Sequence, residues 1–242
     1  MDAIFGALTV LLATSAGALA VLFFGCLKGT KDTALLSFSA GVMAYASIEM
    51  LSESYELSGA LPMIAGFLIG IAALTLSERA LPHVHQHITK KELEHTKKKA
   101  LMIGGAIAIH NIPEGLAIAT AFASSVPLGW FVTTTMAIQD VPEGTLISAP
   151  LLCYGMKKSR AILFGVLSGL VEAAAAIAGF MFLSIFTPLI PIALAFSAGA
   201  MAFVVMVELL PDAFGKGHER VGALAFIGGA VVAFAIASLL SA

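Results

Sequence analysis

Two related hexapeptides hold most of the side chains in this sequence that could do chemistry. The first runs His110-Asn111-Ile112-Pro113-Glu114-Gly115, and the second, Gln139-Asp140-Val141-Pro142-Glu143-Gly144, follows 29 positions later. Each places a carboxylate, a second polar side chain and a proline in an otherwise apolar stretch. Imidazole, carboxylate and amide oxygen atoms are ligands of divalent cations. The two motifs therefore predict a cation site.

Helical spacing brings the polar residues of each motif to one face. The first and fifth residues lie four apart and the second and fifth lie three apart, so their side chains are neighbours on a helix. The proline at the fourth position cannot donate a backbone hydrogen bond, which bends the helix. The linker 124–129 is short and uncharged. We therefore expect two bent helices that form a hairpin, with their motifs at similar depth.

The composition is that of a polytopic membrane protein. The chain has 242 residues, of which 59% are hydrophobic and 12% charged, against about 25% charged in soluble proteins. Segments of about 20 apolar residues are long enough to span a bilayer. The sequence predicts an all-α fold, a single transmembrane domain over 1–242, with eight spans at approximately 4–27, 34–53, 60–79, 100–122, 127–153, 160–184, 189–210 and 221–241.

The basic residues predict how the chain sits in the membrane. All 13 Lys and Arg residues fall in or beside the loops that follow odd-numbered spans. Such loops face the cytoplasm, so both termini should be extracytoplasmic in a multi-pass protein of the cell (inner or plasma) membrane. The lipid bilayer is then a partner and nucleic acid is not. Cys26 and Cys153 lie near cytoplasmic ends of spans and are expected to be free thiols.

Two octets predict an inverted repeat of spans 1–3 and 6–8 around the hairpin of spans 4 and 5. Residues 38–45 and 196–203 share seven of eight residue classes, and they should run in opposite directions, as in many secondary transporters. Close packing of small residues is the other explanation. The acids that follow, Glu49 and Glu208, are one position out of step. They, with Asp212, are candidate pathway residues at opposite mouths, or ordinary interfacial charges.

The middle of the membrane is expected to be strongly acidic. His110 lies roughly 15 Å into its span, near the middle of a hydrocarbon core about 30 Å thick. No Lys or Arg lies inside any span to balance four acids at this depth, namely Glu114, Asp140, Glu143 and Glu172. Two divalent cations would neutralise them, and bound protons are the alternative. The ligand types, with Met43 as a thioether, favour a borderline metal such as Zn²⁺, and they leave Cd²⁺, Fe²⁺ and Mn²⁺ open.

The loop 81–99 contains alternating histidines at 83, 85 and 87. His83, His85 and His87 could contact a divalent metal weakly through ring nitrogen atoms. A solvated polar loop is the other interpretation.

These motifs resemble those of the ZIP metal-ion transporters, and most closely the bacterial GufA-type branch. The resemblance covers the whole chain and implies zinc uptake into the cytoplasm through a binuclear midmembrane site, with an elevator-like movement of spans 1, 4, 5 and 6 against spans 2, 3, 7 and 8. It places Glu208 on the release route. It implies His110, Glu114, Gln139, Glu143 and Met43 as ligands of the first metal, and Asn111, Glu114, Asp140, Glu143 and Glu172 as ligands of the second.

One departure from the family pattern bears on selectivity. Many relatives have His-Asn where this chain has Gln139-Asp140, so an imidazole is replaced by a weaker amide and a carboxylate is added. We expect a harder second site that tolerates metals other than Zn²⁺.

Other function classes remain open at this point. A metal-dependent intramembrane hydrolase would need a general base and a water position, and the sequence has no HExxH motif. The prediction is therefore a transporter, not an enzyme. A metal sensor or a proton-coupled carrier of another cation is an alternative, and the sequence leaves open whether the chain forms a homodimer.

Overall fold

The described part of the chain is helical, with no strand in it. The computed structural model describes residues 1–25, 27, 29–80, 96–153, 155–215 and 217–240, with the backbone alone described for 78–80 and 96–109. The elements are α1(Asp2–Phe24), α2(Thr30–Ser58), α3(Ala60–Ala80), α4(Thr96–Ser124), α5(Val126–Cys153), α6(Lys158–Ile185), η2(Thr187–Leu189), α7(Ile190–Val204), η3(Val205–Leu209), α8(Leu210–Phe214) and α9(Glu219–Leu240).

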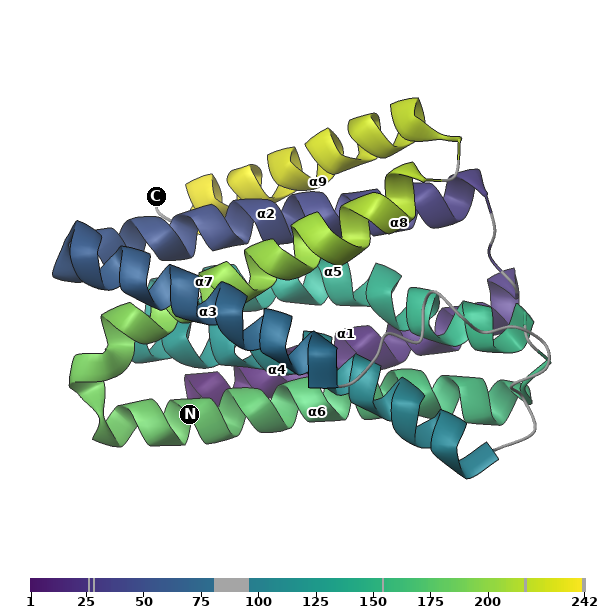
Figure 1. Cartoon of the computed structure of the whole chain (residues 1–242), viewed down its shortest axis with the longest axis horizontal. Helices are drawn as coiled ribbons and strands as arrows, with labels where there is room; N and C mark the ends of the chain where they lie inside the picture. Colours follow the sequence, from purple (N-terminus) through teal and green to yellow (C-terminus); the bar gives the residue numbers. More distant parts are fainter. Residues whose placement is uncertain (26, 28, 81–95, 154, 216, 241–242) are drawn as a thin grey trace.

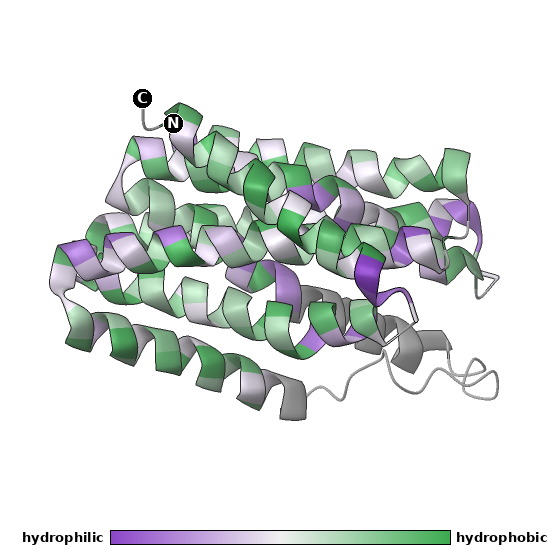
Figure 2. Cartoon of the chain, turned by 90° about the horizontal axis from the view of Figure 1, so that it is seen from above, coloured by the Kyte–Doolittle hydropathy of each residue, from purple (hydrophilic) through white to green (hydrophobic). Residues whose placement is uncertain are grey.

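The helices have the lengths and surfaces of a membrane bundle. Within the described residues, six helical segments are long and apolar enough to cross a bilayer. Large apolar side chains lie on the outside, including Leu12, Phe23 and Ile185, which are 69%, 86% and 75% exposed. Figure 2 shows hydrophobic residues over most of the bundle's length. Such a surface is stable only against lipid. The prediction of an all-α membrane protein is confirmed, and the count of eight spans stays a prediction.

The helices run along one axis with the two chain ends on the same side. Figure 1 shows the start of α1 and the end of α9 at one end of the bundle, and the α1–α2, α5–α6 and α8–α9 connections at the other. Helix α2 and the continuous segment from α7 to α8 run in opposite directions in this view. This arrangement agrees with the predicted inverted repeat and with termini that share a side.

Glycine residues bring four of the helices, α1, α4, α5 and α6, into backbone contact; we call them the first helix set. A Cβ placed on Gly115 of α4 would lie 2.2 Å from the carbonyl oxygen of Glu172 in α6. A Cβ on Gly144 of α5 would lie 2.1 Å from that of Thr14 in α1. These two glycines are the final residues of the two motifs. Each therefore fixes its motif helix against one outer helix.

The other helices form a second helix set, which consists of α2, α3, α7 with its continuation through η3 and α8, and α9; glycine crossings join α2 with α9 and α3 with α7, and α2 also packs on α7. A Cβ on Gly41 of α2 would lie 2.0 Å from the carbonyl oxygen of Phe226 in α9, and one on Gly199 of α7 would lie 2.2 Å from that of Phe67 in α3. Gly41 and Gly199 occupy the same position in the two octets. Among the described glycines, every close approach between two helices joins members of the same set.

The contact between the two sets is made by side chains. Met43 and Met50 of α2, Met136 of α5 and Met201 of α7 are each at most 1% exposed and belong to one apolar core. Methionine is flexible and adapts to irregular surfaces. The sets therefore meet through a surface that is easier to rearrange than the glycine crossings inside each set.

The expectation of free thiols is wrong for Cys153, which is disulfide-bonded. Because α1 packs along α5, the end of α5 reaches the segment that follows α1, and the Cys153 Sγ atom lies 4.0 Å from the carbonyl oxygen of Leu27. Cys26 lies outside the described residues. The expectation rested on both cysteines lying near cytoplasmic ends of spans, where thiols usually stay reduced.

Candidate metal centre

The centre is built on two helices that stay helical through their prolines. Pro113 lies inside α4, and Pro142 lies inside α5. The turn between the helices is tight, and its Ser125 hydroxyl accepts a hydrogen bond from the Leu128 N–H at 3.3 Å. This turn forms the expected hairpin, and the two motifs consequently face each other across it.

Three acids from the hairpin converge. Glu114 of α4 and Asp140 and Glu143 of α5 each offer an oxygen atom, and these atoms lie within 4.8 Å of one another. Glu114 is 2% exposed and Asp140 is fully buried. Burying like charges this close is unfavourable unless a cation or protons neutralise them. We call these residues the carboxylate triad.

Gln139 occupies the middle of the triad. Its side-chain nitrogen donates to Glu114 at 2.8 Å, to Asp140 at 2.9 Å and to Glu143 at 3.1 Å. An amide nitrogen carries two hydrogen atoms, so it cannot fully satisfy three acceptors. The three acids therefore surround a point that suits a group with more positive charge than an amide, such as a metal ion.

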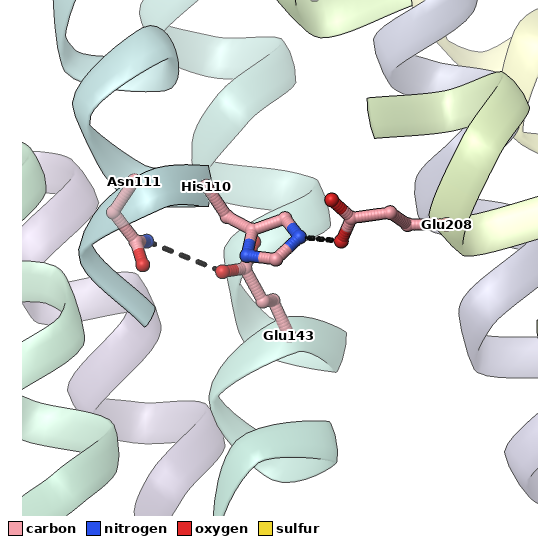
Figure 3. Close-up of polar contacts among 4 residues, drawn as sticks. All are labelled: His110, Asn111, Glu143 and Glu208. Carbon is pink, nitrogen blue, oxygen red and sulfur yellow. Dashed lines mark hydrogen bonds and ion pairs between the residues drawn. The ribbon is translucent and has the colours of Figure 1, made fainter. Parts of the chain in front are cut away.

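Asn111 links the triad to α6. Its side-chain nitrogen donates to Glu114 at 3.3 Å and to Glu143 at 3.2 Å, and its Oδ1 atom accepts a hydrogen bond of 2.7 Å from Ser168. Figure 3 shows the Asn111 amide directed toward Glu143. The fully buried Ser168 hydroxyl therefore sets which end of the Asn111 amide faces the acids.

Replacing Ser168 by alanine is expected to weaken zinc uptake about two- to tenfold in KM. The change removes one hydrogen bond, of about 0.5–1.5 kcal/mol, and lets the Asn111 amide rotate. Uptake kinetics in proteoliposomes measure the effect. Ser184→Ala is the control on the same helix, since this exposed hydroxyl bonds only its own helix backbone at Met181. An unchanged KM in Ser168→Ala would show that the Asn111 orientation does not matter.

Glu172 completes the acidic centre from α6. It is fully buried, and neither of its carboxylate oxygen atoms has a hydrogen-bond partner. The Asp140 Oδ2 and Gln139 Oε1 atoms are likewise buried without a partner. Buried polar atoms are normally satisfied, so the unpartnered carboxylate oxygen atoms of Asp140 and Glu172 would favour a cation. Helix α6 places Glu172 here because its backbone packs on Gly115.

His110 contacts an acid outside the triad. Its Nε2 atom makes a polar contact with the Oε2 atom of Glu208, across the boundary between the two helix sets. Figure 3 shows the imidazole directed toward Glu208 and Asn111 directed toward Glu143. The side chains of His110 and Glu208 remain 18% and 9% exposed. The structure thus joins two predicted site residues that the sequence assigned to separate stations.

Met43 and the acids at the helix ends lie outside the carboxylate triad. Met43 lies in the apolar core between the helix sets and is 1% exposed. The Glu49 carboxylate accepts a hydrogen bond of 2.5 Å from Tyr45, and Asp212 is exposed on α8. His83, His85 and His87 lie outside the described residues.

Two partners of the site were missed by sequence reasoning. Ser168 lies four residues before Glu172, and Tyr45 lies four residues before Glu49, so each pair shares a helix face. This spacing was a usable signal for both. The polar contact between His110 and Glu208 had no such local signal.

Comparison with known proteins identifies the family. A model of the family described as ZIP Zinc transporter matches residues 89–237. The chain is 35% identical over 183 residues to zinc transporter GufA of Myxococcus xanthus, which covers 74% of this chain and 71% of the relative. It is 35% identical over 224 residues to zinc transporter ZupT of Chlorobaculum parvum, with 83% of each chain covered. It is 31% identical over 248 residues to zinc transporter ZIPB of Bordetella bronchiseptica, which covers 94% of this chain and 77% of the relative. Since the match extends over most of the chain and includes both acidic motifs, the chain belongs to the ZIP zinc transporter family.

Proposed function

We propose that this chain carries divalent metal ions, above all Zn²⁺, across the cell membrane into the cytoplasm. The observation that carries the proposal is the buried carboxylate triad together with the unsatisfied oxygen atoms of Asp140 and Glu172. No described lysine or arginine contacts these acids, so a divalent cation is the natural counter-charge. The names of the relatives point to zinc as this cation.

Membership of a transporter family confirms that the chain is not an enzyme. It also argues against an intramembrane hydrolase. A proton-coupled carrier of another cation would use the same acids, and direct uptake measurements with competing metals separate the two.

The proposed site holds two ions that share the carboxylates of Glu114 and Glu143. The first ion would take His110, Gln139 and Met43 as further ligands, and the His110 ring has two nitrogen atoms, of which only Nε2 contacts Glu208. The second would take Asn111, Asp140 and Glu172. Gln139 donates to three carboxylates here, and an amide that turned its Oε1 atom inward would become a metal ligand. The polar contact between His110 and Glu208 supports a release route past Glu208, toward the end that carries the basic loops.

The two helix sets support an elevator-type movement. The first set contains all three triad residues and Glu172, and glycine crossings hold its helices together. The second set contains Glu49 and Glu208, one at each mouth. Among the described side chains, the contact between the sets is rich in methionine and includes few hydrogen bonds, one of them of 2.6 Å from Ser124 to Glu53. A body that carries the metal could therefore slide along one that does not.

Asp140→Asn is expected to change metal preference more than maximal rate. The substitution keeps the size of the side chain and removes one charge, so the harder, more carboxylate-rich second site loses the property that distinguishes it. Uptake of radioactive zinc in proteoliposomes, competed with Cd²⁺ and Mn²⁺, measures the preference. Asp2→Asn, at the first turn of α1, is the control. An unaltered competition order would remove Asp140 from selectivity.

A further inference from the structure

The inverted repeat pairs residues of the two helix sets by fixed offsets. Gly41 with Phe226, and Gly199 with Phe67, are equivalent crossings, and so are Gly229 with Phe38 and Gly70 with Phe196. In each case the α2 residue becomes an α7 residue by adding 158, and the α3 residue becomes an α9 residue by adding 159. The two motifs of α4 and α5 correspond at an offset of 29. A contact on one side of the bundle therefore has a defined counterpart on the other.

The π-helical turn η3 explains why Glu49 and Glu208 are one position out of step with the two octets. A π-helical turn is a one-residue insertion in an α-helix. It follows the octet of α7, and beyond the octets the offset between α2 and α7 is 159, which pairs Glu208 with Glu49 and Asp212 with Glu53. The repeat therefore extends through the mouth acids.

One counterpart contact is missing from this conformation. Ser39 of α2 donates its hydroxyl to the carbonyl oxygen of Gln139 in α5, at 3.4 Å. The offsets turn this pair into Ser197 of α7 and the carbonyl oxygen of His110 in α4. The Ser197 hydroxyl is fully buried and has no hydrogen-bond partner. A buried hydroxyl without a partner is unfavourable, so a conformation that brought the His110 carbonyl oxygen to Ser197 would be stabilised by this contact.

The packing beside Ser197 is also incomplete. An apolar cavity of about 240 Å³ lies between α4, α6 and α7, and its lining includes Leu116, Thr120, Phe182, Phe196 and Ser197. Phe182 and Leu189 at its rim are 50% and 41% exposed, so this cavity opens to the outer surface of the bundle, and closure of α4 on α7 would narrow it.

We infer that Ser39 and Ser197 are alternate latches of the transport cycle: Ser39 holds the Gln139 carbonyl in the conformation described here, and Ser197 holds the His110 carbonyl in the opposite-facing one. The inference rests on the proposed alternating movement of the two helix sets. Closure of α4 on α7 would give the Ser197 hydroxyl its acceptor and reduce the cavity, while Ser39 would lose its own. Both serines are positioning residues and neither is assigned to the metal.

Alanine substitutions should shift the balance of the two conformations in opposite directions. Ser197→Ala removes a group that is satisfied only in the opposite-facing conformation, so the present one should gain about two- to tenfold in population. Ser39→Ala should shift the balance as far the other way, and the double variant should restore it. A general loss of folding stability would not shift the conformational balance of the two variants in opposite directions.

The populations can be measured by pulsed electron paramagnetic resonance on the full chain in lipid nanodiscs. Spin labels on Leu61→Cys in α3 and Val126→Cys in α5, both exposed, report the distance between the two helix sets, with the native cysteines replaced by serine. Ser47→Ala is the control, because this buried hydroxyl of α2 bonds its own helix backbone at 2.8 Å.

Opposite shifts for the two alanine variants, with none for the control, would support the latches. Shifts of the same sign, no shift for Ser197→Ala, or a single unchanging distance would overturn them. Zinc uptake by the unmodified chain in proteoliposomes tests the proposed function separately. Uptake without opposite shifts would remove the latches and leave transport standing, and absent uptake would remove transport itself.

Discussion

Replacing Glu114 or Glu143 by glutamine is expected to lower zinc uptake at least about 100-fold. Each carboxylate is the proposed bridge between two ions, and each side chain already accepts hydrogen bonds from Gln139 and Asn111. Removing one partner of a buried ion pair costs about 3–5 kcal/mol, and a loss of about 3 kcal/mol corresponds to roughly 100-fold in binding. Glutamine keeps the shape and removes the charge. Uptake of radioactive zinc into proteoliposomes measures the loss.

The same variants should fold at least as well as the unmodified chain in the absence of metal. The triad places like charges within 4.8 Å of one another, so removing one relieves repulsion in the folded state. Thermal unfolding in a chelator should therefore show an equal or higher midpoint. Glu56→Gln, on the exposed side of α2, is the control for both measurements. Uptake within about twofold of the unmodified chain would mean that the bridge carries no metal.

Gly115→Ala is expected to destabilise the protein strongly and to reduce uptake with it. The new Cβ would lie 2.2 Å from the Glu172 carbonyl oxygen, which is backbone and cannot turn aside. Overpacking of this kind costs about 1–3 kcal/mol or more, or roughly 2–4 °C of melting temperature per kcal/mol in a chain of this size. Helix α6 would have to move, and Glu172 would leave the centre with it.

Gly228→Ala is the matched control, because a Cβ at this helical position meets nothing within 4 Å. It should leave the melting temperature unchanged or raise it, since alanine is a better helix former than glycine. Equal melting temperatures for the two variants would show that the crossing of α4 and α6 is looser than the structure has it.

The sequence was sufficient to predict the motif helices and the convergence of their acids. The spacing within 110–115 and 139–144 sets the helix faces, and the apolar flanks place both motifs in the membrane. Because these signals are local, the convergence of Glu114, Asp140 and Glu143 could be expected before the structure. The hairpin could be expected in the same way, since 124–129 is too short to separate the two helices.

Contacts between distant helices could not be read in this way. The polar contact between His110 and Glu208 depends on how α7 lies against α4, and the sequence gives no distance across that boundary. The offset of Glu49 and Glu208 was visible but unexplained, because a π-helical turn has no simple composition signal. The approach of Cys153 to Leu27 likewise follows from the packing of α1 on α5.

The most direct test of the central claim is to locate zinc in crystals of the protein by anomalous X-ray scattering at the zinc absorption edge. Anomalous peaks are expected among the carboxylate triad and Glu172, bounded by Gln139 and Asn111, and they should disappear in Glu114→Gln. Zinc found only at surface positions, with the carboxylate triad holding no peak at saturating zinc, would contradict the account.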